Sequence, residues 1–209
     1  SELGSLLTIV VVPYQHIGDQ WVEELSEMSP IAVSGNWRKR LAEAHTAISL
    51  GRLRDLTFVV VKNTASSPDF TQAIENMASE FQNVLLVGDE VHWLGARAFR
   101  ESLVPEANFR LGLSATPERY FDEEGTDHLL DYFGGTVFKL SLGDALKIRD
   151  EKGNQILCPY DYHPKLVSLS DDELIEYREW TAKIGKYKAM RDQYDVEKLL
   201  SDAYNRRAA

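Results

Sequence analysis

The sequence predicts an α/β fold in which a mostly parallel sheet is sandwiched by helices. Short apolar runs rich in β-branched residues recur along the first half of the chain, and segments with helical spacing of apolar residues separate them. Regular alternation of strand and helix is typical of a parallel sheet covered on both faces. The continuous apolar character of the runs also fits strands that are buried on both faces.

The predicted strands are Leu6–Val12, Ile31–Ser34, Leu56–Val61, Val84–Val87 and Phe109–Leu113. Pro13 closes the first of them, because proline cannot continue a central strand. A further strand is expected at Thr136–Leu140, after the Gly134-Gly135 turn. The segment Leu157–Leu169 is expected to be extended and to lead away from the main sheet.

The predicted helices between these strands are Gln15–Met28, Trp37–Leu53, Phe70–Phe81, Ala96–Leu103 and Glu123–Tyr132. Their apolar residues recur at the spacing of one helix face. Two polar, charge-rich helical stretches follow, Asp171–Lys188 and Val196–Arg207. We therefore expect a main domain over residues 1–140 and a linker strand with helices over residues 141–209.

Size and charge limit the class of protein. A chain of 209 residues with 44% apolar and 27% charged residues is long enough for one globular domain with an appendage. Its formal charge of −10 argues against a nucleic-acid binder that relies on a generally basic surface. The densest basic patch consists of Arg38, Lys39, Arg40, Arg52 and Arg54. We interpret it first as a solvated helix face, which would supply salt-sensitive phosphate contacts if the chain binds nucleic acid.

Cys158 is the only cysteine, which excludes an internal disulfide and a cysteine-rich zinc site. A reducing, intracellular setting in the cytoplasm is therefore expected. The apolar runs are shorter than the roughly 20 residues that span a bilayer, so no membrane partner is expected. The apolar start of the chain lacks the basic region and cleavage site of a signal peptide. His163 and Cys158 lack the partners and spacing of a metal site.

Two adjacent carboxylates, Asp89 and Glu90, follow the apolar run Val84–Val87, and His92 comes two residues later. Open α/β sheets bind ligands at the carboxyl ends of their strands. There, one carboxylate could hold Mg²⁺ through water, and the other could act as the base that orients the attacking water in phosphoryl transfer. We assign the first role to Asp89 and the second to Glu90. The alternative is an acidic pair that starts a loop, with a histidine that is merely hydrogen-bonded.

A second polar group follows Phe109–Leu113, in the sequence Ser114-Ala115-Thr116-Pro117. The short hydroxyls of Ser114 and Thr116 are well placed to hydrogen-bond the side chains at the end of the neighbouring strand. The alternative is a serine/threonine turn before a proline.

These two segments, Asp89–His92 and Ser114–Thr116, resemble motifs II and III of superfamily 2 helicases and nucleic-acid translocases. The resemblance implies the first RecA-like domain of a helicase, of the P-loop NTPase class, with ATP and Mg²⁺ as cofactors. It also implies a nucleic-acid partner, DNA by family expectation. In the family, the position of His92 links the nucleotide site to motif III, and the hydroxyls of motif III couple hydrolysis to movement.

The segment from Val11 to Gln15, continuing to Gln20-Trp21, resembles motif Ia. The resemblance implies contact of Pro13, Tyr14 and Gln15 with the nucleic-acid backbone, whereas Trp21 is interpreted mainly as a core residue.

Two further candidates for nucleic-acid contact are weaker. Family members often place a threonine-led turn after the strand that matches Leu56–Val61, and Lys62-Asn63-Thr64 departs from this pattern. Asn63 and Thr64 are kept as candidates there. Arg119, just after motif III, either points toward the substrate or caps its own turn.

The segments Asp131–Gly135 and Leu157–Tyr162 resemble the region after motif III in the type III restriction-subunit and excision-repair-like helicases. Protein subunits of a restriction or repair complex are therefore possible partners. The sequence contains no Gly-x-x-x-x-Gly-Lys-Ser/Thr, the loop that cradles phosphates. We expect the chain to be an internal piece of a larger motor, incomplete without this Walker A loop and a second RecA-like domain, and inactive as an ATPase by itself.

Two other functions compete with this interpretation. A non-catalytic RecA-like scaffold could bind a protein partner through its acidic surface, and it would have no need of the carboxylate of Glu90. A metal-dependent nuclease could use the same acidic pair, but the further carboxylate or lysine partners that it needs are not identifiable.

Overall fold

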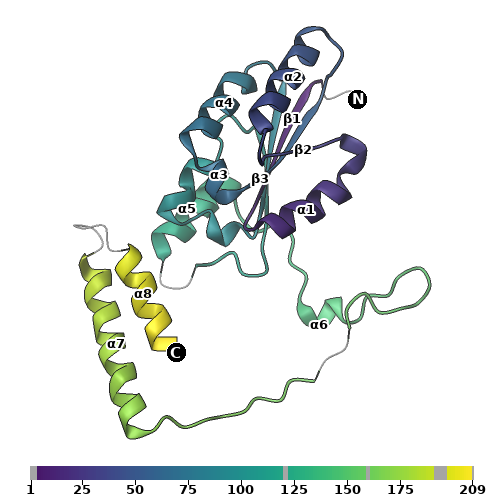
Figure 1. Cartoon of the computed structure of the whole chain (residues 1–209). Coiled ribbons are helices and arrows are strands. Elements are labelled where there is room, and N and C mark those ends of the chain that lie inside the picture. The colour runs from purple at the N-terminus through teal and green to yellow at the C-terminus, as the bar shows by residue number, and fades with distance from the viewer. Residues whose placement is uncertain (1–3, 120–121, 159–160, 191–196, 209) are drawn as a thin grey trace. The chain divides into compact units, whose positions relative to one another are not determined.

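The computed structural model describes residues 4–119, 122–158, 161–190 and 197–208. Its contacts divide the chain into two compact units, one that runs to Lys139 and one that starts at Leu140. The first unit holds a five-stranded sheet in the order β2-β3-β1-β4-β5, and all neighbouring strands are parallel (Figure 1). The predicted α/β class with a parallel sheet is confirmed.

The strands are β1 (Leu6–Val12), β2 (Ile31–Ala32), β3 (Leu56–Val61), β4 (Asn83–Asp89) and β5 (Phe109–Leu113). Their register aligns four strand ends. Val12 lies beside Val61, Val11 beside Gly88, and Asp89 beside Leu113. The residues that follow these strands therefore meet at one edge of the sheet, which we call the carboxyl edge.

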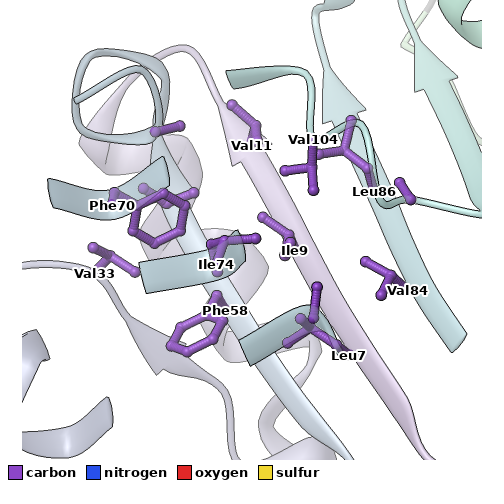
Figure 2. Close-up of a cluster of buried hydrophobic side chains, with 14 of the residues drawn as sticks. Leu7, Ile9, Val11, Val33, Phe58, Phe70, Ile74, Val84, Leu86 and Val104 are labelled. Atoms are coloured by element: carbon purple, nitrogen blue, oxygen red, sulfur yellow. The ribbon is translucent and has the colours of Figure 1, made fainter. Parts of the chain in front are cut away.

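Helices cover the strands β1, β3 and β4 because these strands are apolar on both faces, whereas the edge strand β5 is exposed. On one face, α2 (Trp37–Ser49) and α4 (Pro68–Ala78) bury the main core, in which Phe70 and Ile74 pack near Phe58 (Figure 2). On the other face, α1 (Gln15–Glu24) packs against Val10, Val12 and Val59. The remaining elements of this unit are η1 (Ser26–Met28), α3 (Lys62–Ala65), η2 (Val91–Trp93), η3 (Arg97–Ser102) and α5 (Glu123–Phe133).

Three predicted elements differ from the structure. The expected helix over Ala96–Leu103 is a 3-10 helix, η3. The expected strand Thr136–Leu140 has no strand structure, and Val137 is 96% exposed, because this β-branched run has no partner strand among the described residues. The segment expected over Leu157–Leu169 has no strand in its described part, where residues 161–169 are exposed coil, and residues 159–160 lie outside the described residues.

The second unit contains α6 (Leu142–Ala145), α7 (Asp171–Met190) and α8 (Glu197–Ala208). Helices α7 and α8 pack on each other through Ile184 and Ala203. Among the described residues, no helix is long and apolar enough to cross a membrane.

We expect Tyr132→Phe to lower the free energy of unfolding by about 0.5–1.5 kcal/mol, because it removes one of the two hydrogen bonds to the carbonyl of Val104, which keeps only the amide of Ala107 as donor. The Tyr132 hydroxyl donates to the Val104 carbonyl over 2.6 Å. Burial raises the pKa of Tyr132 to about 12; the charge of Arg110 opposes this rise and that of Glu106 adds to it. A raised pKa means that the neutral phenol stabilises the fold below pH 10 and that this contribution is lost as the pH rises from 10 to 12.

Urea unfolding followed by tryptophan fluorescence, at pH 7 and at several pH values from 9 to 12, measures both effects. The control is Tyr162→Phe, since Tyr162 is 80% exposed and should leave the stability unchanged. Equal stabilities of wild type and Tyr132→Phe at pH 7 would contradict the prediction.

Candidate functional site

The carboxyl edge brings together three of the predicted site residues, Glu90, His92 and Ser114. The Ser114 hydroxyl lies 3.2 Å from Nδ1 of His92 and 3.4 Å from a carboxylate oxygen of Glu90. Nδ1 of His92 is also 3.2 Å from that oxygen of Glu90. These contacts exist because Asp89 and Leu113 are paired in the parallel ladder, so the residues after them leave the sheet side by side. The predicted contact between the hydroxyl of Ser114 and the acidic segment is confirmed.

The backbone of Glu90 is left-handed, with φ 49° and ψ 54°, a conformation that residues other than glycine adopt rarely. Such strained positions cluster at functional sites. The side chain of Glu90 is 43% exposed and that of His92 is 29% exposed. The two described contacts of Glu90 both fall on the same carboxylate oxygen, Oε2. The other oxygen is free of these contacts and could accept a proton from water.

Asp89 is the last residue of β4, and its Oδ2 accepts a hydrogen bond of 2.9 Å from the indole nitrogen of Trp21 on α1. Among the described residues, no group of three or more histidine, cysteine or acidic side chains could enclose a metal. A single carboxylate nevertheless suits Mg²⁺, which keeps several waters and takes few protein ligands. Asp89 therefore fits the predicted role of holding Mg²⁺ through water.

Trp21 was interpreted mainly as a core residue, and the structure gives it both a core and a site contact. Its ring packs against the apolar cluster of Val10, Val12 and Val59, while its N–H reaches Asp89. The spacing of apolar residues along α1 could indicate only the first contact. Trp21 thus links α1, the helix that follows the predicted motif Ia turn, to Asp89, the carboxylate predicted to hold the metal.

We expect Trp21→Phe and Asp89→Ala to be coupled by about 1–2 kcal/mol in a double-mutant cycle of unfolding free energies. The reason is that each change removes one partner of the same charge-assisted hydrogen bond. Urea denaturation of the wild type, the two single variants and the double variant gives this energy. A matched cycle uses Trp37→Phe with Asp89→Ala, which should be additive, because Trp37 packs on the opposite face of the sheet. Additivity in both cycles would show that the Trp21 bond contributes nothing.

The predicted nucleic-acid contacts differ in accessibility. Tyr14 and Gln15 are exposed, whereas Pro13 is buried and its carbonyl accepts a 3.0 Å hydrogen bond from the ammonium group of Lys62. Asn63 is exposed and Thr64 is half-buried. Both lie in the short helix α3 rather than in a turn, because this helix begins directly after the last residue of β3. Nucleic-acid contact by these residues stays a prediction.

Arg119 and Thr116 are placed differently from Ser114. The guanidinium of Arg119 donates to Asp122 over 2.8 Å and to the carbonyl of His92. These hydrogen bonds favour the interpretation in which Arg119 caps its own turn. Contact of Arg119 with nucleic acid stays a prediction. The exposed Thr116 contacts Ser114 through its backbone amide, over 3.2 Å. A coupling role for its hydroxyl also stays a prediction.

The basic patch is largely engaged with the chain itself. Arg38 pairs with Asp69, and Lys39 lies 3.9 Å from Glu43 one helical turn away. The first pair links α2 to α4 and the second lies within α2, and both are exposed, which fits the interpretation of a solvated helix face.

Lys62 and Trp93 also belong to the carboxyl edge, although neither was predicted to have a functional role. Lys62 is buried, and its ammonium group lies 4.7 Å from the ring centre of Tyr14 and 4.8 Å from that of Trp93. Burial lowers the pKa of Lys62 from its usual value. The signal in the sequence was a lysine directly after a buried strand, but its aromatic neighbours come from distant segments.

Comparison with known proteins assigns the chain to a family. A protein of Halobacterium salinarum that bears the name DNA 3'-5' helicase Rad25 is 30% identical over 123 residues. The match covers 59% of this chain but only 18% of that protein. Residues 4–119, more than half of the chain, match the family described as type III restriction enzyme, res subunit. The chain belongs to this helicase-like family of superfamily 2.

Proposed function

We propose that this chain forms part of an ATP-dependent helicase or translocase that couples ATP hydrolysis to movement along DNA. The observation that supports it best is the contact of Glu90, His92 and Ser114, which joins the ends of two neighbouring strands. A network that connects a candidate base to a second segment can transmit a change at one to the other.

In this proposal each residue has a separate task. Asp89 holds Mg²⁺ through water, and the ion would neutralise the charge that develops on the phosphates. Glu90 orients the attacking water and accepts its proton. The contacts of His92 and Ser114 with Glu90 transmit changes at Glu90 to the segment after β5. Thr116 takes part in this coupling. Tyr14, Gln15, Asn63 and Thr64 contact the DNA strand near the turn shaped by Pro13.

The nucleotide needs more than these residues, since the sequence has no phosphate-cradling Gly-x-x-x-x-Gly-Lys-Ser/Thr. We therefore propose that a phosphate loop and a second RecA-like domain complete the site. The isolated chain should then bind ATP weakly and hydrolyse it negligibly. A robust ATPase rate from the purified 209-residue chain would contradict this part of the proposal.

The proposal is tested by movement along DNA. The protein is a longer one that joins this chain to a phosphate loop and a second RecA-like domain, and the assay is ATP-dependent displacement of a triplex-forming strand from duplex DNA. Displacement that requires ATP and is lost in Asp89→Ala supports a motor. ATP turnover without any displacement on duplex or single-stranded tracks would argue against translocation.

The alternative is a non-catalytic scaffold for a protein partner. The acidic charge of the chain and the charged faces of α7 and α8 favour it. A scaffold should bind its partner equally well in the wild type and in Glu90→Gln.

A further inference from the structure

Two exposed aromatic rings, Tyr14 and Trp93, stand together at the carboxyl edge. Tyr14 follows β1 and Trp93 ends η2, just after the acidic segment. Their ring centres are 6.4 Å apart with an edge-to-face angle of 72°. Tyr14 is 48% exposed and Trp93 is 37% exposed. We call this pair the aromatic platform.

Lys62 contacts both rings of the aromatic platform. Its buried ammonium group lies within 5 Å of both ring centres, at 4.7 and 4.8 Å, and it donates to the carbonyl of Pro13 over 3.0 Å. A cation in this position attracts the ring faces and is worth more when it is shielded from water. No carboxylate pairs with Lys62 among the ion pairs of the described residues. The ring of His16 also stacks on Tyr14, with centres 5.7 Å apart and an angle of 8°, and the ring centre of His92 lies 5.4 Å from that of Trp93. Tyr14 and Trp93 still keep 48% and 37% of their surface exposed beside these contacts.

The negative net charge of the chain makes base stacking a more suitable way to hold nucleic acid than phosphate contacts. With a net charge of −10, the chain as a whole repels phosphates, so phosphate contacts alone would give little affinity. Stacking of bases on aromatic rings does not depend on net charge, and every base has a face that can stack. A base pair inside a duplex has its faces covered, so this contact selects single strands.

We propose that the bases of single-stranded nucleic acid stack on the aromatic platform of Tyr14 and Trp93, and that Lys62 positions both rings. The inference rests on the proposed function, and it adds base contacts to the backbone contacts expected near Pro13. It also assigns a role to Trp93 beside the candidate catalytic residues, because Trp93 directly follows His92. A base that stacks on Trp93 therefore lies next to the network of Glu90, His92 and Ser114.

The test combines a change in the DNA with a change in the protein. Binding of the full chain to a fluorescent single-stranded oligonucleotide is measured by anisotropy, beside the same oligonucleotide with abasic sites. The wild type should bind the normal strand roughly 5- to 100-fold more tightly than the abasic strand. Trp93→Ala should bind the normal strand more weakly by a similar factor and should no longer distinguish the two strands.

Further variants separate stacking from structure. Trp93→Phe should keep most of the preference for the normal strand, because a smaller ring still stacks. Lys62→Met removes the cation but keeps the length of the side chain, and it should weaken binding of the normal strand several-fold. Tyr162→Ala, which removes an 80% exposed tyrosine from the second unit, should change nothing.

The outcomes distinguish this inference from the proposed function. If the wild type binds normal and abasic strands equally well, DNA is held by its backbone, and the stacking platform is overturned while the proposed function stands. Unchanged binding by Trp93→Ala has the same meaning. If the wild type binds neither strand, both this inference and nucleic-acid binding by the chain are overturned.

Discussion

Glu90→Gln is expected to lower DNA-stimulated ATP hydrolysis by roughly 10²- to 10⁴-fold in a protein that joins this chain to a phosphate loop and a second RecA-like domain. An amide cannot take a proton from the attacking water. It can still accept the hydrogen bond that Ser114 donates to Glu90, so the local geometry should survive. The turnover number should therefore fall while the binding of ATP changes little.

The matched control is Glu118→Gln, which removes the same charge from an exposed position after motif III. It should leave the turnover number within about twofold of wild type, since surface substitutions rarely perturb distant chemistry. Steady-state kinetics with saturating DNA measures both variants. If Glu90→Gln lost less than about tenfold, Glu90 would not be the base.

Gly95→Ala should destabilise the first unit by about 1–3 kcal/mol, because a methyl group at this buried position has no space. Its Cβ would lie 2.5 Å from the backbone oxygen of Gly125 and 2.7 Å from Cδ of Arg119. A backbone oxygen in packed structure cannot move aside cheaply. The displaced Arg119 would loosen its contact with the carbonyl of His92, so the site should be disturbed together with the fold.

Urea unfolding measures the stability, and the chemical shifts of the histidine signals in NMR spectra report on the surroundings of His92. Gly185→Ala is the opposite case, since a Cβ on this residue of α7 would meet open space. It should stabilise its helix by about 0.5–1 kcal/mol. If Gly95→Ala were as stable as wild type, the close packing of Gly95 against Gly125 would be wrong.

The strands of the sheet were predictable because burial on both faces leaves a continuous apolar run. Leu6–Val12 and Leu56–Val61 are such buried strands and have the predicted bounds. Phe109–Leu113 also has its predicted bounds, although it is an exposed strand at the edge of the sheet. The same reasoning failed at Thr136–Leu140, because a strand requires a neighbour that no single-segment pattern can reveal. The helix expected after the acidic pair became η3 in a segment where Gly95 packs closely against Gly125.

The site was predictable as far as strand order determines it. Parallel strands place Ser114 beside Glu90 whatever the details of the loops. The bond from Trp21 to Asp89 and the position of Lys62 between Tyr14 and Trp93 depend on side-chain directions over 31 to 68 residues of separation. Alternating apolar patterns carry no such information, so these contacts emerge only from the fold.

We propose that the carboxyl edge is the catalytic centre of a DNA-driven ATPase. This proposal is tested most directly by the ATP hydrolysis rate of the extended protein with and without single-stranded DNA. We expect turnover that DNA stimulates at least several-fold. Turnover that is absent under both conditions, with no nucleotide bound, would contradict it and favour the scaffold.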